Sequence, residues 1–494
     1  MLARASAGAG LRTVLVEKRD FGAGVTSRST RLIHGGLRYL ERLQVGLVRE
    51  SLRDRERLLR EFPGIVEPQA FCLPVYRSDS RPSWQLRAGL AVYQLLCLGG
   101  SLPPPRRRTP AETLDLLPGL DRRGLECGFE YFDCQATYPE RLALEAAMQA
   151  AECGAEIRNH TCATGFVVSG SRVEGVRIES SSGTDELRCA LVVNASGAWV
   201  DRVLGRLPGF HADSLLSLVN GTHIVVPGIP GSPRRAVYRE ARSDKRPFFI
   251  IPWRGLFLIG TTESLFTGNP DRTAPTDCDI AYLIDETNQL FPSARIRPES
   301  VLYAYCGSRP LLRSSTGNLQ AISRGHQVVD HERTDGIQGL LTMAGGKLTT
   351  APTFANETLR CVIRKLGVAP ARPVAPSPPP SMDGVPPRIA RIYGPRAPEL
   401  LRYLQQSHGR DLPLVEGCET TCGEVLFAAE REKASTLGDI LLRRTGMAFD
   451  ASYQSSWARE AAEVAGTHLG WDRQRRDSAL EGYFKELSET LRDR

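Results

Sequence analysis

The stretch LRTVLVEK (residues 11–18) is a short apolar run, rich in β-branched residues, with Glu17 near its end. Such a run is typical of a strand buried in a parallel sheet. Residues 2–10, directly before it, are rich in alanine and finish with Gly8 and Gly10, which predicts the last turns of a helix and its stop. Because a helix that leads into a parallel strand belongs to a βαβ unit, an earlier strand is expected. The given sequence lacks that strand and the glycine-rich turn that would follow it.

The rest of the chain carries helix and strand patterns in a definite order. Alanine, leucine and glutamate dominate residues 139–153, which predicts a helix. Helix and strand signals alternate early and hairpin signals come later, so we expect an α/β domain with an antiparallel insert. The predicted strands are residues 165–168, 173–178, 190–194, 223–227, 248–252 and 256–260, with a short turn at residues 253–255.

A proline-rich stretch divides the chain. Residues 369–387, APARPVAPSPPPSMDGVPP, contain too many prolines for a helix or a ladder and predict a semi-rigid linker. Beyond it, residues 424–444 and 457–491 have helical periodicity and mixed charge. They predict a small, mostly helical C-terminal domain.

The composition is that of a large globular protein. The chain has 494 residues, 41% of them apolar and 24% charged, which excludes collagen-like, largely disordered and disulfide-scaffold proteins. The formal charge of +7 favours anionic ligands or an anionic membrane surface. Residues 106–108 are three arginines, but no aromatic interleaving, zinc spacing or helix-turn-helix pattern accompanies them, so nucleic-acid binding is not expected.

The cysteines and the hydropathy of the chain indicate the cellular compartment in which the protein is expected. The 12 cysteines are scattered singly and no signal segment precedes them, which predicts reduced thiols in a cytosol-facing compartment. Cys418 and Cys422 form the one close pair and lack a second pair, so we interpret them as structural and expect no metal site. No run of about 18 apolar residues is present, so the chain is not expected to span a bilayer.

The segment RSTRLIHGGLRYLE (residues 28–41) is the most distinctive motif. Gly35 and Gly36 lack side chains, so the backbone there can approach a flat ring or a pyrophosphate closely. Hydroxyls and a cation for the same ligand come from Ser27, Ser29, Thr30 and Arg31.

Two further segments have the form of anion-binding turns. In VVNASGAW (residues 192–199) a buried strand runs into a turn at Asn194 that can lay backbone amides against a phosphate-bearing cofactor. In MAGGKLTT (residues 343–350) a Gly-Gly turn is predicted to open a helix at Lys347, which would direct free amides at an anion.

A histidine and several cations complete the candidate residues. His223 starts the β-branched run of NGTHIVVP; a lone histidine there is usually a structural hydrogen-bonder, but an imidazole titrating near neutral pH can also act as a base. A small phosphomonoester would require the cationic group that Arg309, Arg324, Arg38 and Lys347 could form.

Together these segments closely resemble the sequence blocks of FAD-dependent glycerol-3-phosphate dehydrogenases. The resemblance covers residues 1–365, and EVLFAAEREKASTLGDILLRRTGM (residues 424–447) is similar as well. In the family's order, the blocks are RSTRLIHGGLRYLE, VNASGAW, NGTHIVVP, FIIPW, LIGTTE, CGSRPLL and MAGGKLTT.

The resemblance implies an α/β fold with three domains. They are an FAD-binding, doubly wound (Rossmann-like) domain without its first strand, an antiparallel-sheet substrate domain, and a helical C-terminal domain. We expect the FAD-binding domain in residues 1–75, 140–205 and 300–368, the substrate or cap domain in 76–139 and 206–299, the linker in 369–388 and the helical domain in 389–494.

It also implies an activity and its residues. The family oxidises sn-glycerol 3-phosphate to dihydroxyacetone phosphate, with hydride transfer to FAD and electrons passed to a membrane quinone. His223 would take the hydroxyl proton, with Arg309 and Lys347 as further catalytic residues, while Arg38, Tyr39 and Arg324 would bind the substrate. FAD would be held by Glu17, Ser27, Ser29, Thr30, Arg31, His34, Gly35, Gly36, Asn194, Ala195, Gly197, Trp199, Gly345, Gly346, Lys347, Leu348 and Thr349.

A peripheral association with the inner membrane surface from the cytoplasm follows from the same resemblance. Residues 81–105, with Trp84 and Tyr93 beside arginines, could be a basic amphipathic helix on that surface, and an ordinary surface helix is the equal alternative. The oligomeric state stays open, with a homodimer as one option.

The chain departs from the family's pattern at three places. Without the glycine-rich turn, amides that would hold the FAD pyrophosphate are missing, so weak cofactor retention is expected. Ala351 and Pro352 replace a Tyr-Arg pair, and Glu263 stands where an aspartate is usual. Two alternatives therefore remain: an amine or 2-hydroxy-acid oxidase of the same superfamily, which the arginine group disfavours, and a truncated remnant without catalysis.

Overall fold

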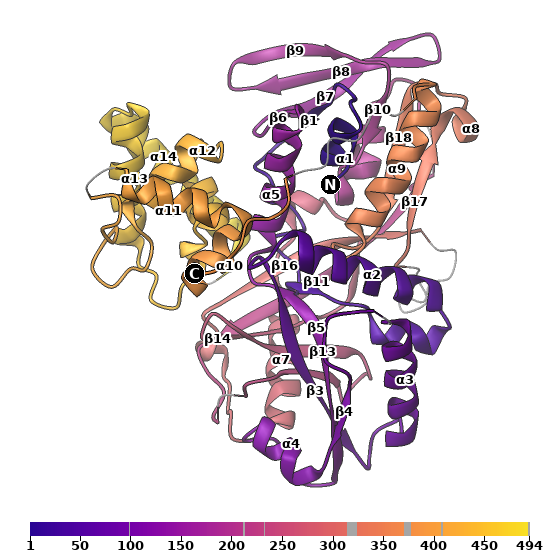
Figure 1. Ribbon diagram of the computed structural model, residues 1–494, viewed down its shortest axis with the longest axis vertical. Coiled ribbons are helices and arrows are strands. Elements are labelled where there is room, and N and C mark those ends of the chain that lie inside the picture. The colour runs from indigo at the N-terminus through magenta and orange to yellow at the C-terminus, as the bar shows by residue number, and fades with distance from the viewer. Residues whose placement is uncertain are drawn as a thin grey trace.

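The computed structural model describes residues 1–97, 99–210, 213–231, 233–313, 324–369, 377–406 and 409–492. Figure 1 shows three regions: strands and helices around the N-terminus at the top, a large sheet below them, and the C-terminal helices on one side.

The N-terminal region begins with the predicted helix and strand, but the strand is not buried as expected, since Val14 is 46% exposed. Helix α1 (Leu2–Gly8) leads into strand β1 (Val14–Val16), which is shorter than the apolar run that predicted it. Strand β1 pairs in parallel with β6 (Glu156–Arg158), and β6 follows helix α5 (Pro139–Glu152), as expected from its composition. Small alanines and leucines of α1 and α5 face each other in one buried apolar cluster, which fixes the helices against this strand pair.

Two further sheets complete this region within the described residues. Strand β10 (Val192–Asn194) pairs in parallel with β18 (Leu340–Gly345), and β17 (His326–Asp330) pairs antiparallel with the other edge of β18. Strands β7 (Cys162–Ser169), β8 (Arg172–Ser180) and β9 (Gly183–Arg188) form a separate antiparallel meander, seen at the top of Figure 1. The predicted strands between residues 165 and 194 are thus confirmed.

The largest sheet has ten strands among the described residues, and its strand pairs are antiparallel as expected except for β3 and β12, which pair in parallel. The predicted hairpin is present: Arg254 and Gly255 both have positive φ, as a type I′ turn requires, and they join β13 to β14. The strands are β2 (Leu32–Ile33), β3 (Val66–Tyr76), β4 (Arg106–Arg108), β5 (Leu125–Ala136), β11 (Leu216–Val226), β12 (Ala236–Glu240), β13 (Pro247–Trp253), β14 (Leu256–Gly260), β15 (Ser264–Phe266) and β16 (Tyr303–Leu312).

Helices pack against the ten-stranded sheet and against the smaller sheets of the N-terminal region. A capping box formed by Thr276 and Asp279 starts α7, whose apolar face packs on β11 and β14. These helices and turns are η1 (Leu37–Arg42), α2 (Val45–Glu61), α3 (Ser83–Leu96), α4 (Pro110–Leu116), α6 (Val200–Leu204), η2 (Gly197–Trp199), η3 (Pro270–Arg272), α7 (Asp277–Leu290), η4 (Pro298–Ser300), α8 (His331–Asp335) and α9 (Ala351–Leu366).

The C-terminal region is helical, as predicted. Residues 370–376 of the predicted linker lie outside the described residues, and those from 377 to 386 form neither helix nor strand. The elements beyond are α10 (Pro387–Tyr393), η6 (Gly394–Arg396), α11 (Ala397–Gln405), α12 (Cys422–Arg431), the π-helix η7 (Asp439–Arg444), η8 (Met447–Phe449), α13 (Ser455–Leu469) and α14 (Arg473–Thr490).

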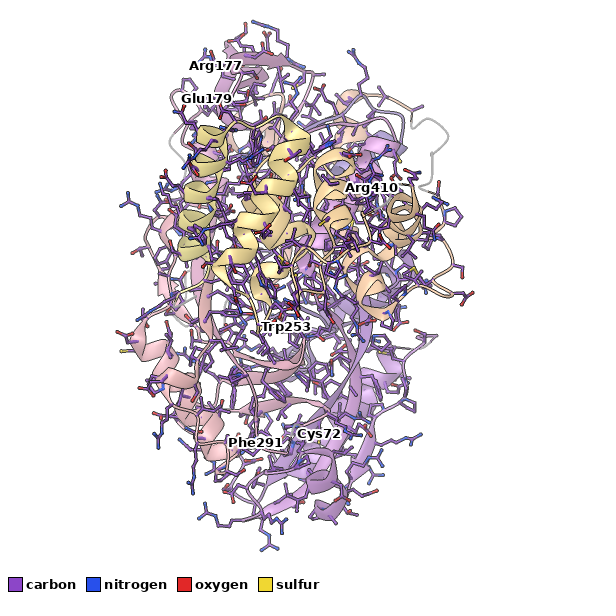
Figure 2. The ribbon with its side chains drawn as sticks, turned by 90° about the vertical axis from the view of Figure 1, so that its left-hand side faces the viewer. Cys72, Arg177, Glu179, Trp253, Phe291 and Arg410 are labelled. Atoms are coloured by element: carbon purple, nitrogen blue, oxygen red, sulfur yellow. The ribbon has the colours of Figure 1, made fainter. Side chains whose placement is uncertain are left out.

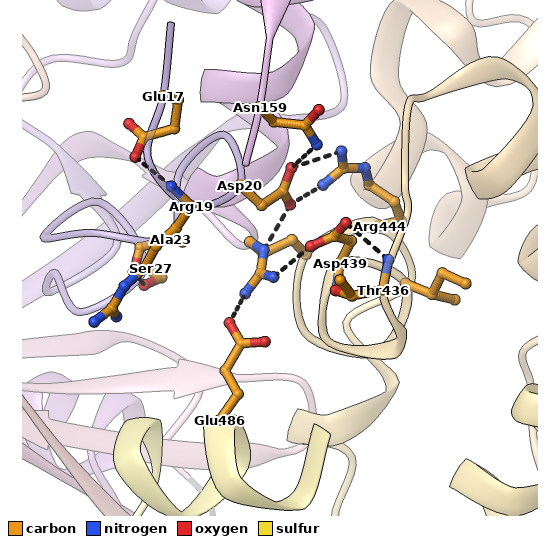
Figure 3. Close-up of polar contacts among 12 residues, drawn as sticks. Glu17, Arg19, Asp20, Ala23, Ser27, Asn159, Thr436, Asp439, Arg444 and Glu486 are labelled. Atoms are coloured by element: carbon orange, nitrogen blue, oxygen red, sulfur yellow. Dashed lines mark hydrogen bonds and ion pairs between the residues drawn. The ribbon is translucent and has the colours of Figure 1, made fainter. Parts of the chain in front are cut away.

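Buried ion pairs and aromatic contacts dock this helical region onto the rest. Arg141 of α5 forms two hydrogen bonds of 2.7 Å with the carboxylate of Glu432, and both side chains are buried. Asp20, just after β1, accepts hydrogen bonds from Arg443 and Arg444 of η7 (Figure 3). Trp253, below the C-terminal helices in Figure 2, packs edge-on against Phe449.

The helices were examined for segments that could span a membrane. Within the described part of the chain, no helix combines the length and apolar character needed to traverse a bilayer.

Candidate active site

A cavity of about 610 Å³ lies where the turn after β2, strands β11 and β16, and the turn between β18 and α9 meet. Most of the sequence-predicted site residues line it, although they come from distant parts of the chain. The predicted residues on its wall are Ser29, Thr30, His34, Gly36, Arg38, Tyr39, Ala195, Gly197, His223, Arg309, Arg324, Gly345, Gly346, Lys347, Leu348 and Thr349.

His223 is a buried histidine of β11 with one ring nitrogen unpaired. Its Nε2 lies 2.9 Å from the hydroxyl of Thr30, its ring stacks on Tyr305 at 5.1 Å, and its Nδ1 has no hydrogen-bond partner. Gly260 on the neighbouring strand makes room for the ring, because a Cβ there would lie 2.3 Å from a ring carbon.

The protonation of His223 differs from the expectation of an imidazole titrating near neutral pH. Burial, followed by the charges of Arg309 and Arg31, lowers the pKa of His223 to about 3. The imidazole is therefore neutral at physiological pH and able to accept a proton. His34, on the same wall, is also neutral, because burial lowers its pKa to about 4.

Glu263 bridges two of the predicted substrate-binding arginines. Its carboxylate accepts a hydrogen bond of 3.0 Å from Arg309 and also contacts Arg324. Burial alone would raise the pKa of Glu263, but the two guanidinium groups outweigh it and lower the pKa to about 2. Gly221 permits this arrangement, because a Cβ there would lie 2.3 Å from the Arg309 guanidinium. The sequence marked Glu263 only as a departure and gave no sign of this bridge.

Lys347 and Tyr39 extend the cationic wall. The ammonium of Lys347 lies 4.5 Å from the centre of the Tyr39 ring and donates a hydrogen bond of 2.7 Å to the hydroxyl of Ser51. Burial would raise the pKa of Tyr39, but Arg324 and Lys347 lower it overall. The cavity thus gathers six basic side chains, which are Arg28, Arg38, Arg42, Arg309, Arg324 and Lys347.

Six predicted cofactor residues do not line this cavity. The clearest case is Arg31, whose guanidinium is fully buried, pairs with both carboxylate oxygens of Glu140 at 3.1 Å and packs on Trp253. Arg31 therefore fixes α5 to the sheet and is not free to contact a ligand, which corrects its assignment. The six residues are Glu17, Ser27, Arg31, Gly35, Asn194 and Trp199.

The other five residues that do not line the cavity form hydrogen bonds with neighbouring groups of the protein. The Gly35 amide donates to the Tyr93 hydroxyl and to Asp133, while the Ser27 hydroxyl donates to the carbonyl of Gly24. Three more contacts are Asn194 Nδ2 to the Val200 carbonyl at 3.1 Å, Trp199 Nε1 to Asp271 at 3.1 Å, and the Arg19 amide to Glu17 Oε1 at 3.0 Å. These groups shape the turns behind the cavity wall.

The turn at MAGGKLTT also differs from its prediction. Gly345 and Gly346 have positive φ, as a Gly-Gly turn requires, but the helix starts at Ala351, four residues later than expected. Lys347 lies in the turn before it, and Pro352 in the first helical turn lacks a backbone donor. An anion at this turn would meet the Lys347 side chain more directly than the helix N-terminus.

The lining of the cavity fits a flavin nucleotide. Apolar and aromatic walls suit a flat ring system, whereas the cations suit phosphate groups.

Several residues that line the cavity were not predicted from the sequence. Of the missed residues named below, Phe249, Thr261 and Glu263 stand in recognised blocks, and the others carry no signal of their own. They include Arg42, Phe71, Asp133, Tyr238, Phe249, Thr261, Glu263 and Phe354.

A cluster elsewhere has the spacing of metal ligands. Among the described residues, one ligand atom each from Asp20, His160 and Asp439 lies within 4.8 Å of the others. Arg443 and Arg444 neutralise the two carboxylates, so the cluster is an ion-pair network (Figure 3).

The chain is similar to known proteins over most of its length. The profile of a family described as FAD dependent oxidoreductase matches residues 1–358, and the profile of the C-terminal domain of alpha-glycerophosphate oxidase matches residues 384–476. A glycerol-3-phosphate dehydrogenase of Synechocystis sp. is 34% identical over 99% of this chain and 94% of its own length. A D-erythritol 1-phosphate dehydrogenase of Brucella abortus is 35% identical over 90% and 91%.

The fold has a solved counterpart. The glycerol-3-phosphate dehydrogenase of Bacillus halodurans, solved in complex with FAD, superposes with a TM-score of 0.77 over 99% of this chain and 92% of its own, at 24% identity. This similarity confirms the predicted class of fold.

Proposed function

Because the chain belongs to the FAD-dependent oxidoreductase family and is an FAD-dependent relative of the glycerol-3-phosphate dehydrogenases, we propose that it oxidises the C2 hydroxyl of sn-glycerol 3-phosphate to dihydroxyacetone phosphate. The observation that carries this proposal is the grouping of Arg309, Arg324 and Lys347 on one cavity wall with His223. A small anion and a reacting hydroxyl can be held there together.

The cations bind the phosphate. Arg309 and Arg324 are already oriented by Glu263, so their remaining donors face an incoming anion without a large loss of conformational freedom. Lys347 adds a point charge that stabilises negative charge developing on the substrate oxygen.

His223 accepts the hydroxyl proton at its unpaired Nδ1. The neutral imidazole is ready to do so, and the negative charge of a bound phosphate raises its affinity for a proton relative to the empty site. Bound FAD supplies the acceptor for the C2 hydride. Thr30, hydrogen-bonded to Nε2, fixes the orientation of the ring.

The electron acceptor that we propose is a membrane quinone. A second cavity, of about 350 Å³, shares Leu37, Arg38 and Tyr238 with the first and has largely apolar walls. On α3, which lines this second cavity, Trp84 and Leu95 expose 71% and 61% of their surface. An apolar quinone ring can enter from a membrane surface on this side, where α3 would lie as the predicted interfacial helix.

A second candidate substrate is D-erythritol 1-phosphate. The relative from Brucella abortus that carries this name is as similar to the chain as the glycerol-3-phosphate dehydrogenase from Synechocystis sp.. The two substrates share a phosphomonoester and a hydroxyl to be oxidised, so the same cationic wall serves both.

Anaerobic reduction of the flavin tests these proposals. Purified protein is mixed with glycerol 3-phosphate, erythritol 1-phosphate, an amino acid or a 2-hydroxy acid, and bleaching of the flavin absorbance is followed. Fast bleaching by glycerol 3-phosphate supports the proposal, preferential bleaching by erythritol 1-phosphate favours the second candidate, and bleaching by the unphosphorylated compounds alone contradicts both. Protein purified without flavin absorbance would favour a remnant without catalysis.

A further inference from the structure

Arg28 lines the active-site cavity, and the chemistry proposed above does not use it. Only 6% of its surface is exposed. Its Nη2 donates a long hydrogen bond of 3.4 Å to the main-chain carbonyl of Glu489 on α14, and its Nε is buried without a partner. Within the described part of the chain, no carboxylate lies at ion-pair distance from Arg28. The charge of this buried guanidinium is therefore not compensated by those residues.

An uncompensated charge inside a protein is unfavourable. A buried guanidinium loses its hydration, which an opposite charge or several hydrogen bonds normally replace. Arg31 shows the ordinary case, because burial would lower its pKa, but Glu140 outweighs burial and raises it. For Arg28, burial and the charge of Arg19 lower the pKa, and the acidic residues of α14 offset only part of this effect. An anionic ligand in the cavity would supply the missing counter-charge.

Arg28 is electrostatically separate from the other basic side chains of the cavity. The charge of Arg324 acts on Arg42, Arg309 and Lys347. The charges that act most strongly on Arg28 instead come from residues that do not line the cavity, with Arg19 first among them. The cavity thus has two positive centres: the group around Arg324, to which we assign the substrate phosphate, and Arg28.

The backbone that carries Arg28 is fixed against strand β16. The hydroxyl of Tyr305 donates a hydrogen bond of 3.0 Å to the carbonyl of Ser29. A Cβ at Gly307 would lie 2.9 Å from the carbonyl oxygen of Arg28, so glycine is needed for this close approach. The guanidinium is therefore attached at a fixed point, which lowers the entropy cost of binding a ligand there.

The chemistry of FAD identifies the anion that Arg28 can meet. In oxidised FAD the pyrophosphate carries the formal charge, because the isoalloxazine, the adenine and the sugar groups are neutral. A guanidinium presents a planar fork of donors that suits phosphate oxygens. The Arg28 amide donates to the carbonyl of Val25 at 3.1 Å, and this turn also places Thr26, which offers a hydroxyl, on the cavity wall.

We propose that Arg28 binds the pyrophosphate of FAD, and that the cofactor in return supplies the counter-charge of this buried guanidinium. Arg28 is then a cofactor-binding residue outside the cationic group that we assign to the substrate. The inference rests on the dependence of the family on FAD. It does not depend on which polyol phosphate is oxidised.

Ligands that share only part of FAD test the proposal. The full-length chain is freed of flavin, and the dissociation constants of FAD, ADP and riboflavin are measured by calorimetry. ADP carries the pyrophosphate without the flavin, whereas riboflavin carries the flavin without a phosphate. Arg28→Met removes the charge and keeps a long side chain, and the control Arg188→Met removes the same charge from the exposed surface of β9.

We expect Kd for FAD to rise roughly 10- to 100-fold in Arg28→Met, the value of a charge-assisted hydrogen bond, and Kd for ADP to rise with it. Riboflavin should bind Arg28→Met as it binds the wild type, and Arg188→Met should bind all three ligands normally. An unchanged Kd for FAD in Arg28→Met would overturn the proposal. An equal loss for riboflavin would do the same, since it would place Arg28 against the isoalloxazine ring.

The stability of the flavin-free chain distinguishes this role from a structural one, in which Arg28 docks α14 through the Glu489 carbonyl. Because the charge is uncompensated without FAD, flavin-free Arg28→Met should melt at the same temperature as the wild type or at a higher one. Saturating FAD should then raise its melting temperature less than that of the wild type. A flavin-free variant that melts lower and shows the full increase with FAD would leave Arg28 as a structural contact.

Failure of this inference and failure of the proposed function are distinguishable, because neither measurement contains a substrate. If no polyol phosphate reduces the flavin, the proposed function fails, while the Kd values still decide the role of Arg28. An unchanged Kd for FAD in Arg28→Met, in a protein that oxidises glycerol 3-phosphate, would overturn the role of Arg28 alone.

Discussion

Arg444 donates a hydrogen bond of 2.9 Å to Oδ1 of Asp20, and neither side chain has any exposed surface. The two residues are 424 positions apart and join the first parallel strand pair to the C-terminal helices. Arg443 contacts the other oxygen of Asp20 at 2.6 Å and continues to Asp439 and Glu486. Three carboxylates thus compensate two buried guanidinium groups, and Asp20 is the carboxylate that contacts both.

Asp20→Ala should therefore destabilise the protein strongly. Removing one partner of a buried ion pair leaves an uncompensated charge and costs about 3–5 kcal/mol. Urea unfolding followed by circular dichroism measures the change. Glu174→Ala, which removes an exposed pair with Arg188, is the control and should cost at most about 1 kcal/mol. Equal effects of the two substitutions would show that the Asp20 network does not dock the helices.

Glu263→Gln tests the carboxylate between Arg309 and Arg324. Loss of its charge leaves two like charges close together and unfixed, so the phosphate-binding wall is no longer preorganised. We expect KM for the phosphorylated substrate to rise roughly 10- to 100-fold, the value of one or two charge-assisted hydrogen bonds. Steady-state kinetics measure it.

Glu263→Asp is the matched control, because it keeps the charge on a shorter side chain. It should retain most of the affinity. A KM that falls in Glu263→Gln would mean that the carboxylate competes with the substrate for the arginines instead of orienting them.

Much of the candidate site was predictable from sequence, because glycine-rich turns and isolated cations mark positions where a chain meets a ligand. His223, Arg309 and Lys347 lie in three separate blocks, and the fold brings them to one cavity. The strands were predictable too, since β13 and β14 carry continuous apolar runs around a turn with Gly255.

Predictions from the sequence failed where a residue's role depends on another residue far away in the chain. Arg31 looked like a ligand-binding cation, but its partner Glu140 is 109 positions away and only the folded chain reveals it. The helix start was misplaced because Gly345 and Gly346 set a turn whose length the sequence does not specify. The pKa of His223 follows from burial, which a motif does not encode.

The free energy of unfolding should depend on pH in a way that reflects the burial of the neutral His223 imidazole. The pKa of this imidazole is about 3 in the folded chain and 6.5 in the reference state, so the unfolded chain binds more protons between these values. Its contribution to stability is complete above pH 6.5 and decreases as pH falls toward 3. Urea midpoints measured from pH 7 to pH 5 should fall less steeply in His223→Gln than in the wild type. Identical slopes would contradict a neutral buried imidazole.

The same substitution should remove the base. We expect His223→Gln to bind the phosphorylated substrate almost normally but to reduce the flavin roughly 100- to 10,000-fold more slowly. Rapid-mixing absorbance measurements separate the two steps. Because the folded imidazole stays neutral down to low pH, the wild-type kcat/KM should show no loss between pH 7 and pH 6 from protonation of His223. A loss in that range that disappears in His223→Gln would contradict this assignment.

The exposed face of α3 predicts how the protein meets a membrane. Trp84 and Leu95 can insert into the interface while the net positive charge attracts anionic lipids, so sedimentation with anionic vesicles is expected, with a blue shift of Trp84 fluorescence. Leu95→Ser should weaken vesicle binding roughly 30-fold, since burial of a leucine side chain contributes about 2 kcal/mol. Leu412→Ser removes a leucine of similar exposure in the C-terminal region, which lies on the other side of the molecule from α3 in Figure 1, and should change nothing. Equal losses in the two variants, or binding that ignores lipid charge, would exclude α3 as the docking helix.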